Sequence, residues 1–246
     1  MRGKLIVIEG TDCSGKETQS KLLSERLDSL GIKNEVIDFP NYNSPTGRIF
    51  GSCYLGKEHL CNEHLVSKNG WFPEGASNVD PLVASLLVAA DRKYNIKKVN
   101  DLLDNGVNVI LDRYVYSNMA HQGCKIDDDI KRKEFINKME VLEFGLLELP
   151  TPDLNILLYM PVEQSNELKK KREEKADQHE VDLDYLYRAE NTYLFLKDLY
   201  DMVLIKCTES NRIRTKEEIN NDLLNIVLET IKKKENAKCK KLSKEF

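Results

Sequence analysis

The sequence has little glycine and proline and lacks long apolar runs. Of its 246 residues, 12 are Gly and 7 are Pro, which excludes collagen-like and linker-rich chains, and 41% hydrophobic residues are too many for a disordered chain. No apolar run approaches the roughly 18 to 20 residues that cross a bilayer. The apolar run that ends at Ile8 is too short for the core of a signal peptide. These features predict a soluble intracellular protein in the cytoplasm.

An excess of positive charge is also absent. Lys and Arg total 37 against 41 Asp and Glu, a formal net charge of -4, so neither nucleic acid nor a membrane is an expected partner. Residues 232–246 are locally basic, and 236–246 form a Lys-rich tail that is either a solvated helix end or a tether. The six cysteines include no C-x-x-C pair, which favours a reducing compartment over a disulfide framework.

Apolar runs alternate with helical patterns along the chain. Continuous or β-branched runs predict strands at 4–8, 34–39, 107–111, 153–160 and 202–207. Amphipathic patterns predict helices at 15–30, 81–105, 129–147, 164–199 (two helices) and 215–235. The last helix opens with a capping box between Thr215 and Glu218. Together these elements predict an α/β fold, a doubly wound five-stranded parallel sheet with helices on both faces.

The predicted topology has consequences for the site and for the domain plan. Ligands of a doubly wound sheet bind beyond the carboxyl ends of its strands. A single domain is expected over 1–235. Residues 43–80 mix Gly, Asn, His and Pro without a long period, and we expect a short helix at 46–55 followed by a loop or insertion.

The strongest chemical signal follows the first predicted strand. Glycines at 10 and 15 let the backbone wrap an anion, the helix that begins at Lys16 adds its positive end, and the Lys16 ammonium reaches the β- and γ-phosphates of a nucleotide. We call this segment the phosphate loop and predict that all its residues contact ATP: Gly10, Thr11, Asp12, Cys13, Ser14, Gly15, Lys16, Glu17 and Thr18.

One position of the phosphate loop departs from the usual motif. A Ser or Thr that directs its hydroxyl to Mg²⁺ normally follows the lysine, but here Glu17 stands there and Thr18 comes one residue later. The G-K-x-T-Q arrangement resembles adenylate kinase and its relatives, with Thr18 as a candidate metal ligand. The chain also lacks the N-K-x-D base-recognition motif of GTPases. The pattern therefore favours a small-molecule phosphotransferase.

The second signal is the run Asp112-Arg113-Tyr114 directly after a predicted strand. A carboxylate at a strand end beside a phosphate loop is placed to hold Mg²⁺, usually through water. The adjacent Arg113 can bind an incoming phosphate with two parallel hydrogen bonds. An internal Asp-Arg pair is the structural alternative.

Together these segments resemble the thymidylate kinase family. The matching pieces are 8–19, 38–40, 86–92, 111–118 and, more weakly, 177–180. The resemblance spans roughly residues 4 to 230. It implies a P-loop nucleoside monophosphate kinase fold with a lid, and transfer of the γ-phosphate of ATP to dTMP to give dTDP. It also implies Mg²⁺ as cofactor and a homodimer.

The resemblance assigns a role to each matching residue. Asp12 would accept a hydrogen bond from the 3′-hydroxyl of dTMP, Phe39 would pack against the sugar or base, and Arg92 would bind the monophosphate. Arg113 would bridge the acceptor and the transferred phosphate. The substrate pocket is completed by Tyr42, Ser117, Asn118 and Gln122. The structural alternatives are a surface ion pair for Arg92, a core position for Phe39, and turn or helix-cap roles for the polar residues from 117 to 122.

A lid is expected at about 165–185. Some family members carry a basic residue in the phosphate loop, but Cys13 and Ser14 stand there in this chain, so the lid must supply the charge that neutralises the moving phosphate. Arg172 is the first candidate for this catalytic role, followed by Lys171, Lys175 and Arg188.

Two departures from the family concern the nucleobase. Val88 occupies the place of an aromatic residue that stacks on thymine, so stacking would come from His121, Tyr42 or Trp71, or be absent. Residues 57–80 are longer than the usual connection. A kinase for another nucleoside monophosphate or a deoxynucleoside, and a catalytically weak regulatory protein that binds nucleotides, are therefore alternatives to a dTMP kinase.

Overall fold

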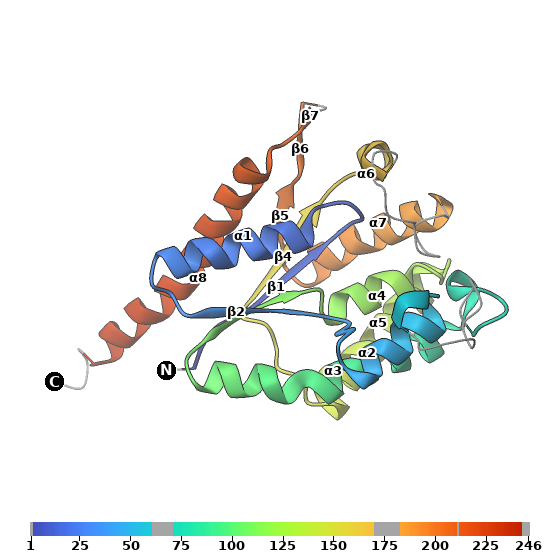
Figure 1. Ribbon diagram of the computed structural model, residues 1–246, viewed down its shortest axis with the longest axis horizontal. Helices are drawn as coiled ribbons and strands as arrows, with labels where there is room; N and C mark the ends of the chain where they lie inside the picture. The colour runs from blue at the N-terminus through green and yellow to red at the C-terminus, as the bar shows by residue number, and fades with distance from the viewer. Residues whose placement is uncertain (1, 61–70, 170–182, 211, 243–246) are drawn as a thin grey trace.

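A parallel sheet of five strands forms the centre of the protein in the computed structural model (Figure 1). The structure describes residues 2–60, 71–169, 183–210 and 212–242. The strands lie in the order β2-β3-β1-β4-β5, and their bounds are β1 Leu5–Gly10, β2 Asn34–Asp38, β3 Asn108–Asp112, β4 Leu154–Tyr159 and β5 Val203–Lys206. All five predicted strands are confirmed. Because every pair is parallel, the carboxyl ends share one edge of the sheet.

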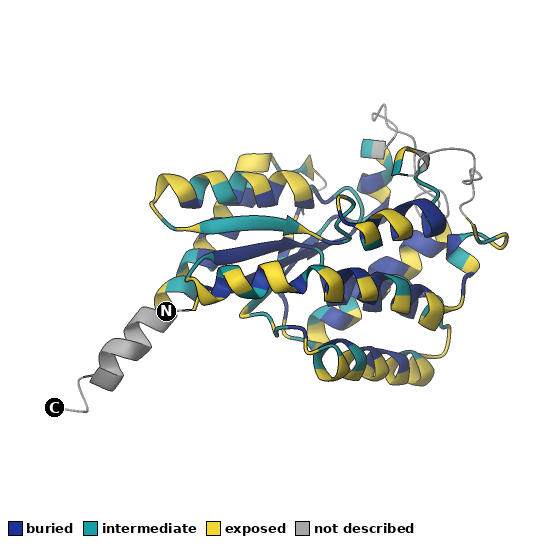
Figure 2. Ribbon diagram, turned by 60° about the horizontal axis from the view of Figure 1, so that its bottom comes forward, coloured by how far each residue is buried: buried dark blue, intermediate teal, exposed yellow. Residues whose placement is uncertain are grey.

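Helices cover both faces of the sheet because both faces are apolar. Along β1, Leu5 and Val7 point to one face and Ile6 and Ile8 to the other, and all four are buried. Figure 2 shows the inner strands of the sheet coloured as buried. The first face packs against α3 (Pro81–Asp104), α4 (Val115–Gly123), α5 (Asp129–Glu140) and α7 (Leu183–Leu199). The second face packs against α1 (Lys16–Ser29) and α8 (Lys216–Leu242). The predicted doubly wound α/β fold is confirmed.

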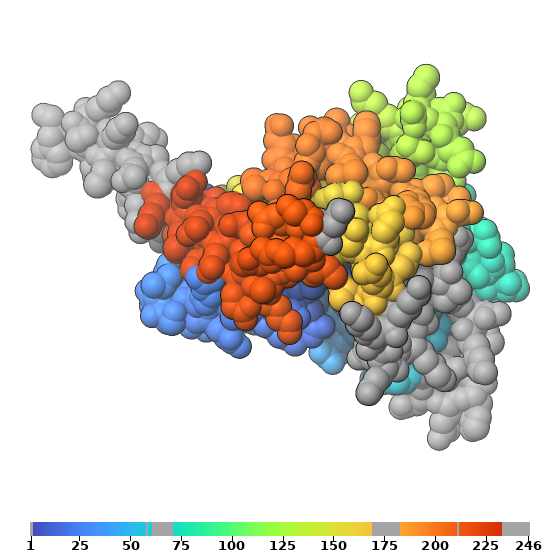
Figure 3. Space-filling view, turned by 90° about the horizontal axis from the view of Figure 1, so that it is seen from above, coloured from blue at the N-terminus to red at the C-terminus, as the bar shows by residue number. Residues whose placement is uncertain are grey.

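The helices α1 and α8 lie side by side on the second face (Figure 3). The Asn220 amide of α8 donates to the side-chain oxygen of Gln19 at 2.9 Å, and both side chains are buried. The predicted capping box opens α8, since the Glu218 amide donates to Thr215 Oγ1 at 3.1 Å and the Glu218 carboxylate accepts from the Thr215 amide at 2.7 Å. These contacts fix α8 against the helix that follows the phosphate loop.

The segment after β2 is held by one buried carboxylate of α3. Asp91 accepts hydrogen bonds from the Asn41 amide at 2.8 Å, the Ser44 hydroxyl at 2.8 Å and the Thr46 hydroxyl at 2.7 Å. The segment then forms α2 (Pro45–Ile49), a π-helical turn (Phe50–Tyr54) and two short 3₁₀ turns, Glu58–Leu60 and Ala76–Asn78. The expected short helix at 46–55 is thus present as α2 and the π-helical turn. Residues 61–70 of the expected insertion lie outside the described part.

The structure differs from the sequence-based prediction mainly around α4. This helix was not predicted because it is only nine residues long and eight of them are buried, polar ones included, so it lacks an exposed polar face. The helix predicted at 129–147 is α5 followed by a π-helical segment, Val141–Leu146. The first helix of 164–199 is α6 (Val162–Lys169), and the hairpin of β6 (Thr208–Glu209) and β7 (Arg212–Ile213) was not predicted. No helix in the described ranges is both long and apolar enough to cross a membrane.

Candidate active site

The phosphate loop connects β1 to α1 and is fastened to β4. The Thr11 hydroxyl donates to the Met160 carbonyl at 2.7 Å and accepts from the Met160 amide at 2.8 Å. A Cβ at Gly10 would lie 2.4 Å from Ser14 Oγ, so only glycine fits where the loop folds back on itself. Gly15, with φ +77°, takes a left-handed conformation immediately before α1. The loop conformation predicted from the spacing of Gly10 and Gly15 is therefore present in the structure.

Lys16 holds its ammonium inside the phosphate loop. Its Nζ donates to the carbonyls of Gly10 and Thr11, both at 3.0 Å. Burial lowers the pKa of Lys16 to about 8, and the nearby Arg113 lowers it as well, while Asp112 and Asp12 oppose this shift. The amine of the free protein is therefore only partly protonated near pH 8, and a bound anion would favour its charged form.

Asp112 ends β3 next to β1, where it pairs in register with Ile8. Burial raises the pKa of its carboxyl, Lys16 and Arg113 lower it, and the carboxylates of Asp38 and Glu17 raise it further. Asp112 thus lies beside the phosphate loop among groups of both signs. A divalent cation would relieve the repulsion between these carboxylates.

Arg113 has a backbone conformation that few arginines adopt. Its φ is +69°, in the left-handed region, and its amide donates to the Ile8 carbonyl at 3.1 Å. Its guanidinium donates to the Ser117 hydroxyl at 3.3 Å and to the Tyr193 hydroxyl at 3.4 Å. The chain therefore turns sharply at the end of β3, and the Arg113 side chain lies against α4 and α7.

The Glu9 side chain holds the turn between β3 and α4 in place, although Glu9 was not among the predicted site residues. Its carboxylate is fully buried and accepts from the amides of Tyr114 at 2.9 Å and Ser117 at 3.0 Å, and from the Ser117 hydroxyl. Burial raises the pKa of Glu9, while its hydrogen bond with Ser117 and the charge of Arg113 lower it. The signal available in the sequence was an acidic residue inside a buried strand, which needs partners.

The polar residues predicted to line the base pocket lie on α4. Asn118 Nδ2 donates to the Glu143 carboxylate at 3.2 Å, and Gln122 Nε2 donates to the Tyr54 hydroxyl at 3.4 Å. The carbonyl oxygens of both amides are buried, and no residue in the described part of the chain donates to them. The carbonyl oxygens of Asn118 and Gln122 can therefore each accept a hydrogen bond from a ligand. Neither residue acts as a simple helix cap.

The remaining predicted substrate residues are more deeply placed. Arg92 is 1% exposed and its guanidinium is bound by the buried carboxylate of Glu143, so its partner is a core residue and not a surface carboxylate. Phe39 is buried against Tyr114, with ring centroids 6.1 Å apart. Val88 packs in a separate apolar cluster with Tyr54, on which the ring of Tyr42 also packs. Their substrate roles stay predictions.

A small hollow lies between the phosphate loop and α7. Its lining includes Thr11, Asp12, His121, Glu190 and Tyr193. The His121 ring stacks on Tyr185, with its Nδ1 3.0 Å from the Tyr185 hydroxyl, and meets Tyr193 edge-on. Among the stacking candidates, His121 is thus at the site, whereas Trp71 is 57% exposed and no described contact brings it there.

Other predicted residues are exposed or lie outside the described part of the chain. Glu17 and Thr18 are exposed on the first turn of α1, and Glu17 pairs with Lys21 at 2.6 Å. The lid candidates Arg172, Lys171 and Lys175 lie outside the described residues. The same holds for all side chains of the Lys-rich tail, 236–246.

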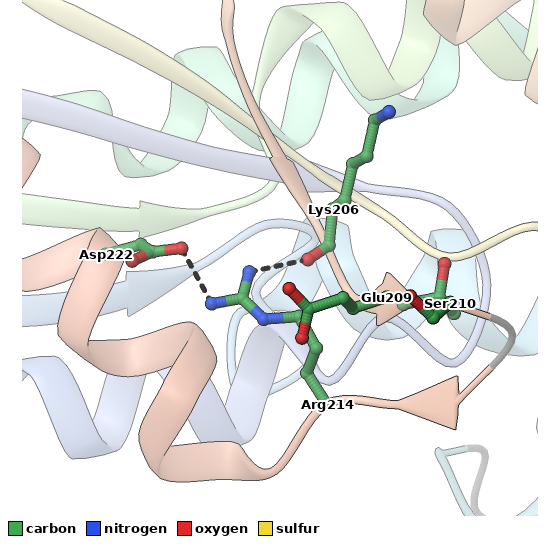
Figure 4. Close-up of a pocket in the computed structure, with 6 residues that line it drawn as sticks. Lys206, Glu209, Ser210, Arg214 and Asp222 are labelled. Atoms are coloured by element: carbon green, nitrogen blue, oxygen red, sulfur yellow. Dashed lines mark hydrogen bonds and ion pairs between the residues drawn. The ribbon is translucent and has the colours of Figure 1, made fainter.

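A larger open hollow, of about 580 Å³, lies beside β5, the β6–β7 hairpin and α8 (Figure 4). Arg214 crosses it and donates to the Asp222 carboxylate at 2.7 Å and to the Lys206 carbonyl at 2.9 Å. Because this guanidinium is already bound, and because Glu209 and Asp222 balance Lys206 and Arg214, the hollow shows no preference for an anion. It borders the phosphate loop, because Cys207, between the lining residues Lys206 and Thr208, directs its thiol to the Ser14 carbonyl at 3.7 Å.

The strand order, the phosphate loop after β1 and the Asp-Arg pair at the end of the adjacent β3 together define a P-loop kinase of small phosphorylated substrates. The family model for thymidylate kinase matches residues 8–67 and 73–220. The "Probable thymidylate kinase" of Pyrococcus abyssi is 32% identical over 228 residues, which cover 92% of this chain and 97% of the relative. The chain belongs to the thymidylate kinase family.

Two further comparisons agree. The thymidylate kinase of Homo sapiens is 30% identical over 159 residues, which cover 65% of this chain and 62% of the human protein. The solved structure of thymidylate kinase from Candida albicans superposes with a TM-score of 0.68 at 26% identity, covering 94% of this chain and 93% of that one. The predicted activity, ATP-dependent phosphorylation of dTMP, is confirmed at the level of the family.

Proposed function

We propose that the residues at the carboxyl edge of the sheet divide the dTMP kinase reaction among them. The observation that supports this is the convergence of Lys16 and Arg113 beside Asp112, where β1 and β3 end next to each other. A phosphate oxygen of dTMP attacks the γ-phosphorus of ATP. The bond from that phosphorus to the bridging oxygen breaks, and ADP leaves with the electron pair. No covalent bond to the protein forms.

The roles follow from charge and position. The phosphate loop and Lys16 bind the phosphates of ATP through backbone N–H groups, the positive end of α1 and the ammonium. Arg113 binds the phosphate that is transferred and offsets the charge that spreads over its oxygens. Asp12 accepts a hydrogen bond from the 3′-hydroxyl of the sugar. Arg172 supplies further positive charge from the lid. Such catalysis consists of positioning and electrostatic stabilisation.

Mg²⁺ fits the donor set at this edge. The described residues include no cluster of three or more side chains that would hold a metal ion by themselves. Mg²⁺ usually keeps several waters and binds one or two carboxylates together with substrate phosphates. Asp112 is placed for this, with Asp38 and Glu17 near enough to influence its pKa, and the Thr18 hydroxyl is a weaker candidate. When bound, the ion neutralises phosphate charge.

Thymine recognition is assigned to the two amides of α4. The Tyr54 hydroxyl and the Glu143 carboxylate each accept one N–H of these amides, so Gln122 and Asn118 each offer a carbonyl oxygen and a second N–H to a ligand. This pair suits thymine or uracil, whose N3–H donates and whose O4 accepts, whereas N3 of cytosine accepts and its N4 amine donates. Ser117 completes this wall of the pocket, and Phe39 and Tyr42 lie on the side of β2 and α2.

We further propose a homodimer in the cytoplasm. The outer side of α3 carries Leu82, Leu86, Ala90 and Tyr94 at intervals of four residues, all exposed. Such an apolar stripe suits an isologous contact with a second copy. The thiols of Cys124 and Cys207 are free, which fits a reducing compartment.

A coupled assay of ADP release tests the proposal. ATP and Mg²⁺ are supplied with dTMP, dUMP, dGMP, dCMP, AMP or thymidine as acceptor. We expect turnover with dTMP, weaker turnover with dUMP, and none with dCMP, because an amide oriented to accept from N3–H and donate to O4 of thymine would face an acceptor at N3 and a donor at N4 of cytosine. Equal turnover with dCMP would overturn the assignment of Gln122 and Asn118. Absence of turnover with every acceptor, in protein that binds ATP, would overturn the catalytic proposal.

A further inference from the structure

The guanidinium of Arg113 is held by neutral hydroxyl groups. In the described part of the chain its hydrogen bonds go to Ser117 Oγ and to the Tyr193 hydroxyl. Arg92, by contrast, is bound by the Glu143 carboxylate. A carboxylate partner cancels much of the charge of an arginine, whereas a hydroxyl fixes its direction and leaves the charge available to a phosphate. From this contrast we infer that Tyr193 is a positioning residue for Arg113 in phosphoryl transfer.

The direction of the hydrogen bonds can be assigned. Ser117 Oγ has one proton, which it donates to the Glu9 carboxylate. The contact of 2.9 Å between Ser117 Oγ and the Tyr193 hydroxyl must then use the Tyr193 proton. The Tyr193 oxygen is left as an acceptor, and Arg113 donates to it. A continuous series of donors thus runs from Arg113 through Tyr193 and Ser117 to Glu9.

Tyr193 is well suited to hold a fixed position. It is 1% exposed, lies on α7 among the core residues of the first face of the sheet, and meets the ring of His121 edge-on at 5.7 Å. A buried phenol ring has few conformations, so its hydroxyl stays where α7 places it. Asp12 and Glu9 also lie near this hydroxyl. The position of α7 therefore sets the direction of the Arg113 side chain, which directly follows β3.

This inference rests on the proposed function, because it assigns Tyr193 a role through Arg113. The test is Tyr193→Phe, which keeps the ring and removes the hydroxyl. We expect kcat with dTMP to fall about tenfold, because one hydrogen bond to a charged group is lost. The KM for ATP should stay unchanged. Tyr116→Phe is the matched control, since its buried hydroxyl accepts from Asn155 away from Arg113, and its kcat should stay within about twofold.

A purely structural role is separated by a double-mutant cycle. In an Arg113→Ala background, Tyr193→Phe should cost less than about twofold further, because the group that it positions is gone. A full tenfold loss in both backgrounds, or a kcat equal to wild type for Tyr193→Phe, would overturn the inference. Thermal unfolding of each variant checks that the fold is kept. If the wild-type chain itself did not phosphorylate dTMP, the proposed function would fail first, and the inference with it.

Discussion

The guanidinium of Arg92 on α3 is bound by both carboxylate oxygens of Glu143, and both side chains are buried, at 1% and 0% exposure. Asn118 of α4 donates to the same carboxylate. Helix α3, helix α4 and the π-helical segment after α5 therefore meet at one buried ionic group. Such a pair adds little stability when complete, but loss of one partner leaves an unpaired charge in the core.

Glu143→Gln tests this relationship. The substitution keeps the shape of the side chain and removes its charge, so we expect the free energy of unfolding to fall by about 3 to 5 kcal/mol. Urea denaturation measures it. Glu134→Gln, at an exposed position of the same helical region, should change stability by less than about 0.5 kcal/mol. A loss below about 1 kcal/mol for Glu143→Gln would show that Arg92 finds another partner easily.

Arg113 permits two truncations that separate catalysis from backbone strain. Both Arg113→Ala and Arg113→Gly should lower turnover by roughly 10²-fold or more and leave ATP binding nearly intact, because the lost contact is strongest in the transition state. At φ +69°, however, alanine keeps the left-handed strain and glycine relieves it. The Gly variant should be more stable by about 1 kcal/mol in thermal or urea unfolding. Equal losses in ATP affinity and turnover would contradict the role of Arg113.

Lys16 gives a pH-dependent prediction. Burial lowers its pKa to about 8, so above pH 8 most of the free protein has a neutral amine. Phosphates favour the charged amine and raise this pKa. ATP binding should therefore take up a proton near pH 8.5, and affinity should decline as pH rises through 8. Calorimetry in two buffers of different ionisation enthalpy measures the uptake. Lys16→Arg should abolish it, because a guanidinium stays protonated throughout; uptake unchanged in that variant would refute the assignment.

The local features of the fold could be read from sequence, and the long-range ones could not. The strands are continuous apolar runs, and the phosphate loop is fixed by Gly10, Gly15 and Lys16, so short windows contain the information. The contact between Glu9 and Ser117 joins residues 108 positions apart, and that between Arg92 and Glu143 joins residues 51 apart. Periodicity carries no information on such partners. Resemblance supplied Ser117 and Arg92 but not the residues that hold them.

Lys125 ties the segment after residue 71 to the end of α4. Its Nζ donates to the carbonyls of Ala76 at 2.8 Å and Val79 at 3.0 Å and to the Tyr54 hydroxyl at 3.2 Å. Tyr54 also accepts from Gln122 in the proposed base pocket. Burial lowers the pKa of Lys125 to about 8. Burying the charged ammonium costs free energy, and its hydrogen bonds to three acceptors offset this cost.

Lys125→Met should therefore weaken nucleobase binding. We expect the KM for dTMP to rise about tenfold, because the hydrogen bonds from a charged donor are lost. Both kcat and the KM for ATP should change less than about twofold. Steady-state kinetics with each substrate varied in turn measures this. Lys131→Met, an exposed lysine at the start of α5, is the control and should be neutral. Parallel changes in both KM values would point to a general loss of structure instead of an effect on the base pocket.

The outer stripe of α3 tests the proposed homodimer. Leu82 and Leu86 are both 49% exposed on the same side of the helix, and burying them against a second copy would remove this apolar surface from water. Leu86→Glu would place a charge at the centre of that contact, so the dissociation constant should rise at least about 100-fold. Sedimentation or light scattering over a concentration series measures it. Ile130→Glu, on α5 and 74% exposed, lies off the stripe and should leave the dimer intact. If the wild-type chain is a monomer at all concentrations tested, or if Ile130→Glu dissociates the dimer and Leu86→Glu does not, α3 is not the contact.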